Sequence, residues 1–184
     1  MRISNIVYNI DQIFTQNIFL LDNKRNIIMD GKFTKIVYSD ELFMTNGIFI
    51  NVPFVLDNFS VSLQVKDNTD IIQSGGSHMK CFLLFKSSDV DNEKIIQDLI
   101  HIENSILEFY KQIFKCDKKI TTILKSQLYN GCIKSYIDMT EYNNLLKSKF
   151  PMMRNFVLKI SGIWEDYNNI GLTYKFVTST IPYI

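Results

Sequence analysis

The chain has 184 residues, of which 46% are hydrophobic and 21% are charged. This composition is typical of a packed globular protein and excludes wholesale disorder. Twenty Lys and Arg residues stand against 19 Asp and Glu residues, a formal net charge of +1, so no global electrostatic field directs the chain to nucleic acid or to a membrane. No apolar run approaches the ~20 residues of a membrane-spanning helix, and we predict no membrane partner.

The first third of the chain is predicted to form strands, because apolar and polar residues alternate there and turn residues separate the runs. Asn46-Gly47 is the sharpest hairpin signal, since a tight hairpin turn requires positive φ at its central residues. The predicted strands cover residues 3–10, 18–21, 27–29, 32–39, 48–52 and 59–65.

Successive side chains of a strand point to opposite faces, so the strand predicted over residues 32–39 has two faces of different composition. One face carries Phe33, Lys35 and Val37. The other face carries Lys32, Thr34, Ile36 and Tyr38.

A short segment at residues 74–79 resembles an artificial joint. It reads Ser-Gly-Gly-Ser-His-Met, a flexible Gly/Ser linker followed by the dipeptide that a common cloning site leaves at a start codon. We predict one domain over residues 1–184, formed by residues 1–73 and 79–184 and joined by an engineered linker that replaces a loop. The alternative is a fusion of two separate proteins. Residues 67–79 are expected to be exposed and poorly ordered.

After this joint, a helical period over residues 92–114 predicts one long helix with a broad buried face. Residues 118–129 are ambiguous, with 126–129 a candidate strand before the turn at Asn130-Gly131. The other predicted elements are strands over residues 81–85, 132–137, 155–164 and 170–177, and a short helix over 140–149. The predicted fold class is therefore α+β: a mostly antiparallel sheet, either an OB-like barrel or a curved sheet, with one long helix packed on it.

Catalytic constellations are absent from the sequence. His78 and His101 are the only histidines, His78 lies in the joint, and no phosphate-binding, dinucleotide or nucleophile-elbow motif occurs. The isolated Cys81, Cys116 and Cys132 form no metal-binding pair and fit a reducing compartment. Glu165-Asp166 could serve a metal but has no third ligand nearby. We predict no enzyme activity, no catalytic residue, no metal and no cofactor.

Basic and aromatic residues interleave on two of the predicted strand regions, and this is the one functional signal. Single-stranded nucleic acid binds by stacking its bases on exposed aromatic rings while Lys and Arg neutralise its phosphates. The alternative is structural, because strand aromatics usually lie in a core and a strand lysine often protects a sheet edge. The candidate nucleic-acid-binding residues are Lys32, Lys35, Tyr38, Lys159, Trp164, Tyr174 and Lys175.

Four segments carry a resemblance to a known group of proteins. Residues 158–165 and 170–176 look like a C-terminal signature of small proteins of large nucleocytoplasmic DNA viruses. Residues 33–39 and 46–50 are similar to the KI-YS and NG-(I/L)-(Y/F) segments of the same proteins. Some of these proteins resemble single-stranded DNA-binding proteins with OB-type folds.

The resemblance implies a non-enzymatic protein of viral origin that binds single-stranded DNA in the cytoplasm or nucleus of a host cell, at the virus factory, or within the virion. High hydrophobicity and near-zero charge leave a second hypothesis open. In that hypothesis the chain is a structural or assembly subunit that acts through protein-protein contacts, as a homo-oligomer or with a viral partner.

Overall fold

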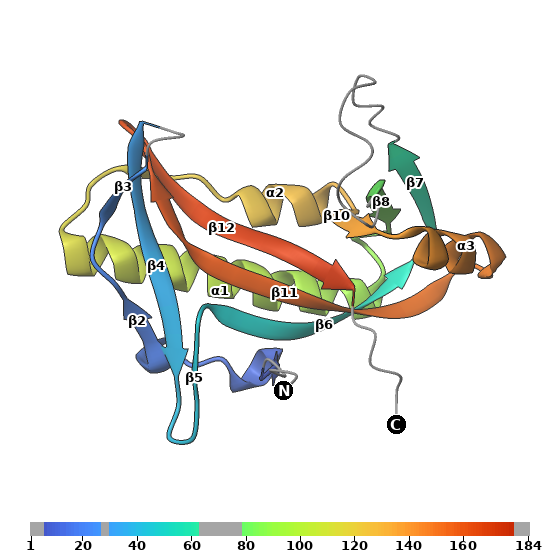
Figure 1. Ribbon diagram of the computed structural model, residues 1–184, viewed down its shortest axis with the longest axis horizontal. Helices are drawn as coiled ribbons and strands as arrows, with labels where there is room; N and C mark the ends of the chain where they lie inside the picture. The colour runs from blue at the N-terminus through green and yellow to red at the C-terminus, as the bar shows by residue number, and fades with distance from the viewer. Residues whose placement is uncertain (1–5, 27–29, 63–78, 179–184) are drawn as a thin grey trace, which may run out of the picture.

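The computed structural model describes residues 6–26, 30–62 and 79–178. Within these ranges a nine-stranded and a three-stranded sheet combine with three α-helices and two short 3-10 helices (Figure 1). The fold is therefore α+β with mostly antiparallel sheets, as predicted, and the described strands do not close into a barrel.

The strands are β1 (Tyr8–Asn9), β2 (Ile18–Leu20), β3 (Lys24–Asn26), β4 (Gly31–Ser39), β5 (Met44–Thr45), β6 (Ile48–Leu56), β7 (Asn58–Ser62), β8 (Met79–Leu84), β9 (Lys119–Ile120), β10 (Cys132–Ile137), β11 (Met152–Glu165) and β12 (Asn169–Thr178). The helices are α1 (Val90–Phe114), α2 (Ile123–Tyr129) and α3 (Met139–Lys147), with 3-10 turns at Ile10–Gln12 and Thr15–Asn17.

Strand β11 is the centre of the large sheet. It pairs antiparallel with β12 along one side. Along the other side it pairs first with β6 and then with β4. In the small sheet β8 lies between β7 and β10. In both sheets, strands from before the predicted joint therefore pair with strands from after it.

Residues 74–78 of the predicted linker lie outside the described residues. Met79, which the sequence assigned to the linker, begins β8, pairs with Ile137 and is half-buried. The expectation of an exposed, poorly ordered residue is therefore wrong at Met79.

Helix α1 covers one face of the large sheet, and no described helix or strand covers the opposite face (Figure 1). The Asp89 carboxylate accepts a hydrogen bond from the Asp91 N–H and caps the helix start, and Lys115 ends it in the left-handed region at φ 49°. Ile96, Leu99 and Ile106 pack into the core from the helix. Each such buried side chain contributes roughly 1.5–3 kcal/mol of hydrophobic free energy. The prediction of a long helix here is confirmed.

Three local predictions were wrong. Asn46-Gly47 does not form the predicted hairpin turn, because only Gly47 has a positive φ and β5 before it pairs with β4, not with β6. Residues 126–129 belong to helix α2, whose Leu124 and Leu128 are both buried, four residues apart on one face. Strand β6 does not end at Pro53 but continues to Leu56. Pro53 is tolerated because its main-chain position faces away from β11, where a strand needs no N–H.

None of the described helices is both long enough and apolar enough to cross a bilayer.

Candidate nucleic-acid interface

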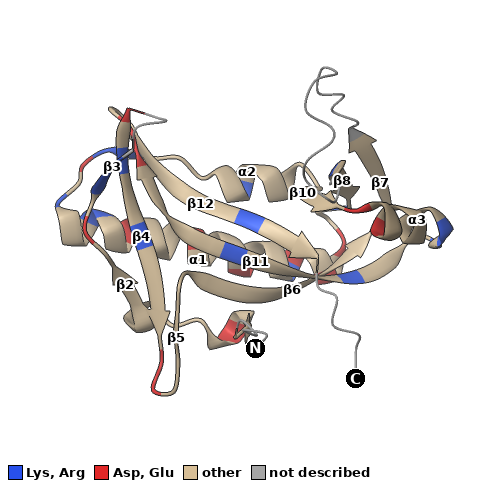
Figure 2. Ribbon diagram, viewed as in Figure 1, with Lys and Arg blue, Asp and Glu red and all other residues tan. Residues whose placement is uncertain are grey.

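The uncovered face of the large sheet, here called the open face, carries three of the predicted basic residues. They are Lys35 on β4, Lys159 on β11 and Lys175 on β12, and each alternates with buried neighbours on its strand. Figure 2 shows basic positions on these three neighbouring strands in the middle of the sheet. Lys35 and Lys175 are exposed and Lys159 is half-buried. The strand period thus gathers three positive charges from distant parts of the chain.

Lys159 and Lys175 stand directly opposite each other in the β11–β12 ladder. Side chains at such positions lie on the same face, and like charges there destabilise a sheet. The Lys159 ammonium lies 5.0 Å from the centroid of the Phe49 ring. Among the described residues no Asp or Glu forms an ion pair with Lys35, Lys159 or Lys175. The open face therefore holds positive charge that no described acidic residue neutralises.

Two aromatic rings lie on the same face beside these lysines. Phe33 of β4 and Trp164 of β11 are cross-strand partners. The Phe33 ring lies over Gly162 and the Trp164 ring lies over Gly171, so closely that a Cβ atom at either glycine would overlap the ring. Both rings are half-buried, and each therefore leaves part of its surface in reach of a ligand. Rings that fill the space above a glycine also stabilise the sheet.

Phe33 was absent from the predicted site. Its position two residues before Lys35 put it on the same predicted face, so the strand period contained the signal.

The structure does not bring all seven predicted residues together. Tyr38 lies on the covered face and is fully buried. Its hydroxyl donates to the Gln12 carbonyl at 3.0 Å and accepts from the Phe14 N–H at 3.2 Å and from the Asn17 amide at 3.3 Å. Tyr38 therefore anchors the N-terminal segment and has no ring surface for a base.

Lys32 and Tyr174 also lie on the covered side. The Lys32 ammonium is 3.5 Å from the Glu165 carboxylate. The Tyr174 hydroxyl donates to the Gln127 side-chain oxygen at 2.9 Å, and burial raises the pKa of this phenol far above its usual value. Lys35, Lys159, Trp164 and Lys175 remain as the predicted residues that share the open face.

The Glu165 carboxylate is the centre of a charged cluster on the covered side. It accepts from the Lys118 ammonium at 2.7 Å and from the Tyr110 hydroxyl at 2.6 Å. Burial, the largest single influence, raises the pKa of Glu165, but these hydrogen bonds and the two lysines together hold it below its usual value. Burial and the hydrogen bond to Glu165 raise the pKa of Tyr110 to about 12. Glu165 therefore stays ionised and paired.

Asp166, the neighbour of Glu165 in the suggested metal pair, accepts from the Asn168 and Asn169 N–H groups at 2.8 and 2.7 Å and shapes the β11–β12 turn. Over the residues that the structure describes, no group of three or more His, Cys, Asp or Glu side chains is arranged to hold a metal.

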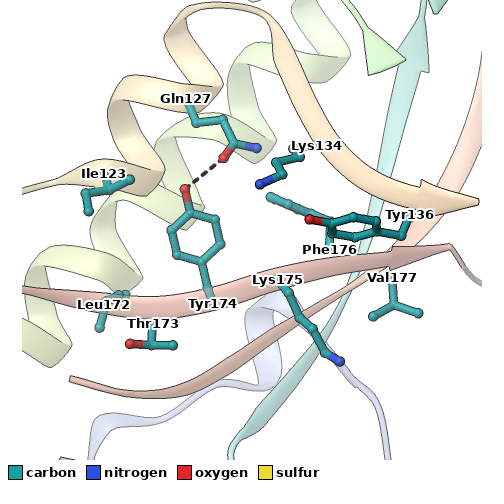
Figure 3. Close-up of a pocket in the computed structure, with 10 residues that line it drawn as sticks. All are labelled: Ile123, Gln127, Lys134, Tyr136, Leu172, Thr173, Tyr174, Lys175, Phe176 and Val177. Carbon is teal, nitrogen blue, oxygen red and sulfur yellow. Dashed lines mark hydrogen bonds between the residues drawn. The ribbon is translucent and has the colours of Figure 1, made fainter. Parts of the chain in front are cut away.

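A groove of about 630 Å³ runs along the outer edge of β12, adjacent to the open face (Figure 3). Helix α2 and strand β10 form its far wall. Its lining residues are Ile123, Gln127, Lys134, Tyr136, Leu172, Thr173, Tyr174, Lys175, Phe176 and Val177.

No family model, no curated protein and no solved structure matches this chain. The arrangement of the open face is therefore the basis of the functional argument.

Proposed function

We propose that the protein binds single-stranded nucleic acid on the open face and carries out no chemistry on it. The observation that carries the proposal is the Lys159–Lys175 pair. Two like charges directly opposite each other cost stability unless an anion lies between them. A nucleic-acid phosphate is an anion that would turn this repulsion into attraction.

The aromatic rings favour single strands over a duplex. Phe33 and Trp164 present ring surface on the same face as the lysines, and only unpaired bases can stack on protein rings. Each stacked base contributes roughly 1–3 kcal/mol and discriminates little between sequences. The proposed complex therefore places phosphates over the lysines and bases over the rings.

The resemblance to OB-type single-stranded DNA-binding proteins of large DNA viruses adds to this proposal, as do the viral origin and the virus-factory location that it implies. The viral origin and the location remain predictions, and so does the OB-type fold, since the described strands do not close into a barrel.

Fluorescence anisotropy with a labelled oligonucleotide of about 20 thymidines tests the proposal. We expect micromolar affinity at low salt. With three phosphates neutralised, the logarithm of the affinity should fall against the logarithm of the salt concentration with a slope of about −2. The variant Lys159→Glu should weaken binding, while Lys94→Glu, at an exposed position of α1, should not. Absent binding at low salt, or binding that salt does not weaken, contradicts the proposal.

A second candidate function is that of an assembly subunit, and one observation favours it. Leu42, Phe43 and Met44 stand in sequence at the β4–β5 turn with 81%, 51% and 75% of their surface exposed. The Asp40 carboxylate accepts from the Leu42 and Phe43 N–H groups and fixes the turn. A cluster of exposed apolar side chains on a turn of fixed conformation is typical of a protein-protein interaction site. Light scattering tests it: an oligomer that Leu42→Ser dissociates supports this function, and a monomer at all concentrations contradicts self-assembly.

A further inference from the structure

The two outer edges of the large sheet are protected to different degrees. The β6 edge is closed over most of its length. Strand β1 pairs with Ile50 and Asn51, Pro53 has no N–H to offer, and the Asn92 side chain bonds both the N–H and the carbonyl of Val55, at 2.9 and 3.0 Å. Natural sheets protect edges in such ways against pairing with other chains.

The β12 edge is paired with a described strand only near its start. Strand β9 pairs only with Asn169 and Ile170. The Ile170 carbonyl accepts from the Thr121 N–H at 2.8 Å, on the side away from β11. Main-chain direction alternates along a strand, so Leu172, Tyr174 and Phe176 also direct their N–H and carbonyl groups away from β11. Within the described part of the chain, no main-chain or side-chain group bonds to them.

The groove along this edge has apolar walls. Ile123, Tyr136 and Val177 are among the exposed large apolar side chains of the protein, at 41%, 58% and 42% exposure, and all three line it. In Figure 3, Tyr174 and Phe176 of β12 point to the side on which Tyr136 and Lys134 lie, whereas Lys175 and Val177 point to the opposite side of the strand. Strand β10 contacts β12 here without pairing with it. The volume of about 630 Å³ lies within the range of sites that hold ligands.

The charges at the groove have one sign. Lys134 and Lys175 line it, and none of its lining residues is acidic. The Lys134 ammonium lies 5.7 Å from the centroid of the Tyr136 ring. Neither lysine forms an ion pair with a described residue. An occupant with carboxylates would therefore be complementary in charge.

We propose that the groove binds an extended, acidic peptide segment of a partner protein, which adds as a further strand to β12. A strand placed about 4.8 Å from β12 pairs its main chain with the outward N–H and carbonyl groups of Leu172, Tyr174 and Phe176. Its side chains on the α2 side contact Ile123 and Tyr136 and lie near Lys134. Its side chains on the open-face side contact Val177 and lie near Lys175, and its carboxylates reach the lysine on their own side. The alternating donors and acceptors of the β12 edge match a peptide main chain and not a sugar-phosphate chain. This proposal does not depend on nucleic-acid binding.

Amide hydrogen exchange tests whether the edge is open. We expect the N–H groups of Tyr174 and Phe176 to exchange much faster than those of Thr173 and Lys175, which face β11. Equal protection of all four would mean that the edge is already occupied, and the proposal would be wrong.

Binding is tested with a fluorescein-labelled library of seven-residue peptides in which Glu or Asp alternates with Val, Ile or Leu. We expect library members to bind, and those with Lys in place of the acids not to bind. N-methylation of every second amide of a binding peptide removes its edge hydrogen bonds and should weaken binding about tenfold or more. No binding up to millimolar peptide, or equal binding of the N-methylated peptide, overturns the proposal.

Matched variants separate this groove from the open face. Lys134→Glu should weaken the acidic peptide about fivefold and leave oligonucleotide binding unchanged. Lys35→Glu, at an exposed position of β4 on the open face, should do the reverse. Unfolding midpoints equal to that of the wild type verify that both variants fold. If Lys134→Glu leaves peptide binding unchanged, the groove is not the binding site.

Discussion

Charged side chains on the two sides of the large sheet differ in whether they have partners of opposite charge. On the covered face Glu165 is paired with Lys118 and Lys32, and the fully buried Glu103 bonds the main chain of α2. On the open face Lys35, Lys159 and Lys175 have no acidic partner among the described residues. Charge on the covered face is placed for stability, whereas charge on the open face costs stability and is available to a ligand. Mutation of the two faces should therefore change different properties.

The largest expected effect is at Glu103, which lies on helix α1 at the covered side of the sheet. Its carboxylate accepts from the Leu124 and Lys125 N–H groups at 3.0 and 2.9 Å and holds the start of α2 against α1. Glu103→Ala leaves two donors without an acceptor and should lower the free energy of unfolding by about 2–4 kcal/mol, measured by urea denaturation. Glu103→Gln, which keeps one acceptor, should cost less. Glu108→Ala, exposed on the same helix, should change the free energy by less than about 0.5 kcal/mol.

Glu165→Gln should lower the free energy of unfolding by about 1–3 kcal/mol at neutral pH, because Lys118 and Lys32 lose their partner. The folded-state pKa of Glu165 is lowered, so its stabilisation is present above the unfolded pKa of about 4.3 and disappears as the pH falls through the folded value. Denaturation of both proteins from pH 7 to pH 3 measures this. If the two proteins still differ in free energy of unfolding at pH 3, the loss in the variant comes from altered packing and not from the lost charge.

On the open face, removal of a lysine should raise the stability of the protein and weaken its binding to an oligonucleotide. Lys175→Thr removes the repulsion with Lys159 and should raise the free energy of unfolding by about 0.2–0.5 kcal/mol. The same change removes one phosphate contact, so the salt slope of oligonucleotide binding should become shallower by about 0.7. If Lys175→Thr lowers the free energy of unfolding and keeps the wild-type salt slope of oligonucleotide binding, Lys175 stabilises the fold and does not bind phosphate.

The smallest effect is expected at the β4–β5 turn, which belongs to neither face. Leu42→Ser removes an 81% exposed side chain and should change the free energy of unfolding by less than about 0.5 kcal/mol. Thermal unfolding at low protein concentration measures this. A larger loss would mean that Leu42 packs against a second copy even in dilute solution.

Local patterns in the sequence were enough to predict most of the elements. The helical period over residues 92–114 and the long final hairpin both appear in the structure. The hairpin predicted at Asn46-Gly47 does not, because β5 before it pairs with β4 and not with β6. These signals are local, because each depends on residues within a few positions of one another. Period two also separated Lys35 from Tyr38, which the predicted site had combined although they lie on opposite faces of one strand.

Other features depend on contacts between residues far apart in the chain, and such contacts produce no local pattern in the sequence. The Asn92 side chain completes the β6 edge 37 residues away, and Glu103 caps a helix that starts 20 residues later in the chain. Each is a single polar side chain within an apolar helical stripe, where a solvent-facing position is the simpler interpretation. The bulge in β11 between Ile160 and Gly162 also shifts which residues face outward, and alternation alone does not reveal it.

The pairing of early strands with late strands has a consequence for how the protein assembles. Strand β6 pairs with β11 and strand β7 pairs with β8, so each half of the chain completes the sheets of the other. Expressed as two polypeptides, one ending after β7 and one starting at β8, the halves would have to find each other before either could bury its core. Folding would become a second-order reaction whose yield depends on concentration. The covalent link thus gives each half a high effective concentration relative to the other, so that the two halves associate within one molecule.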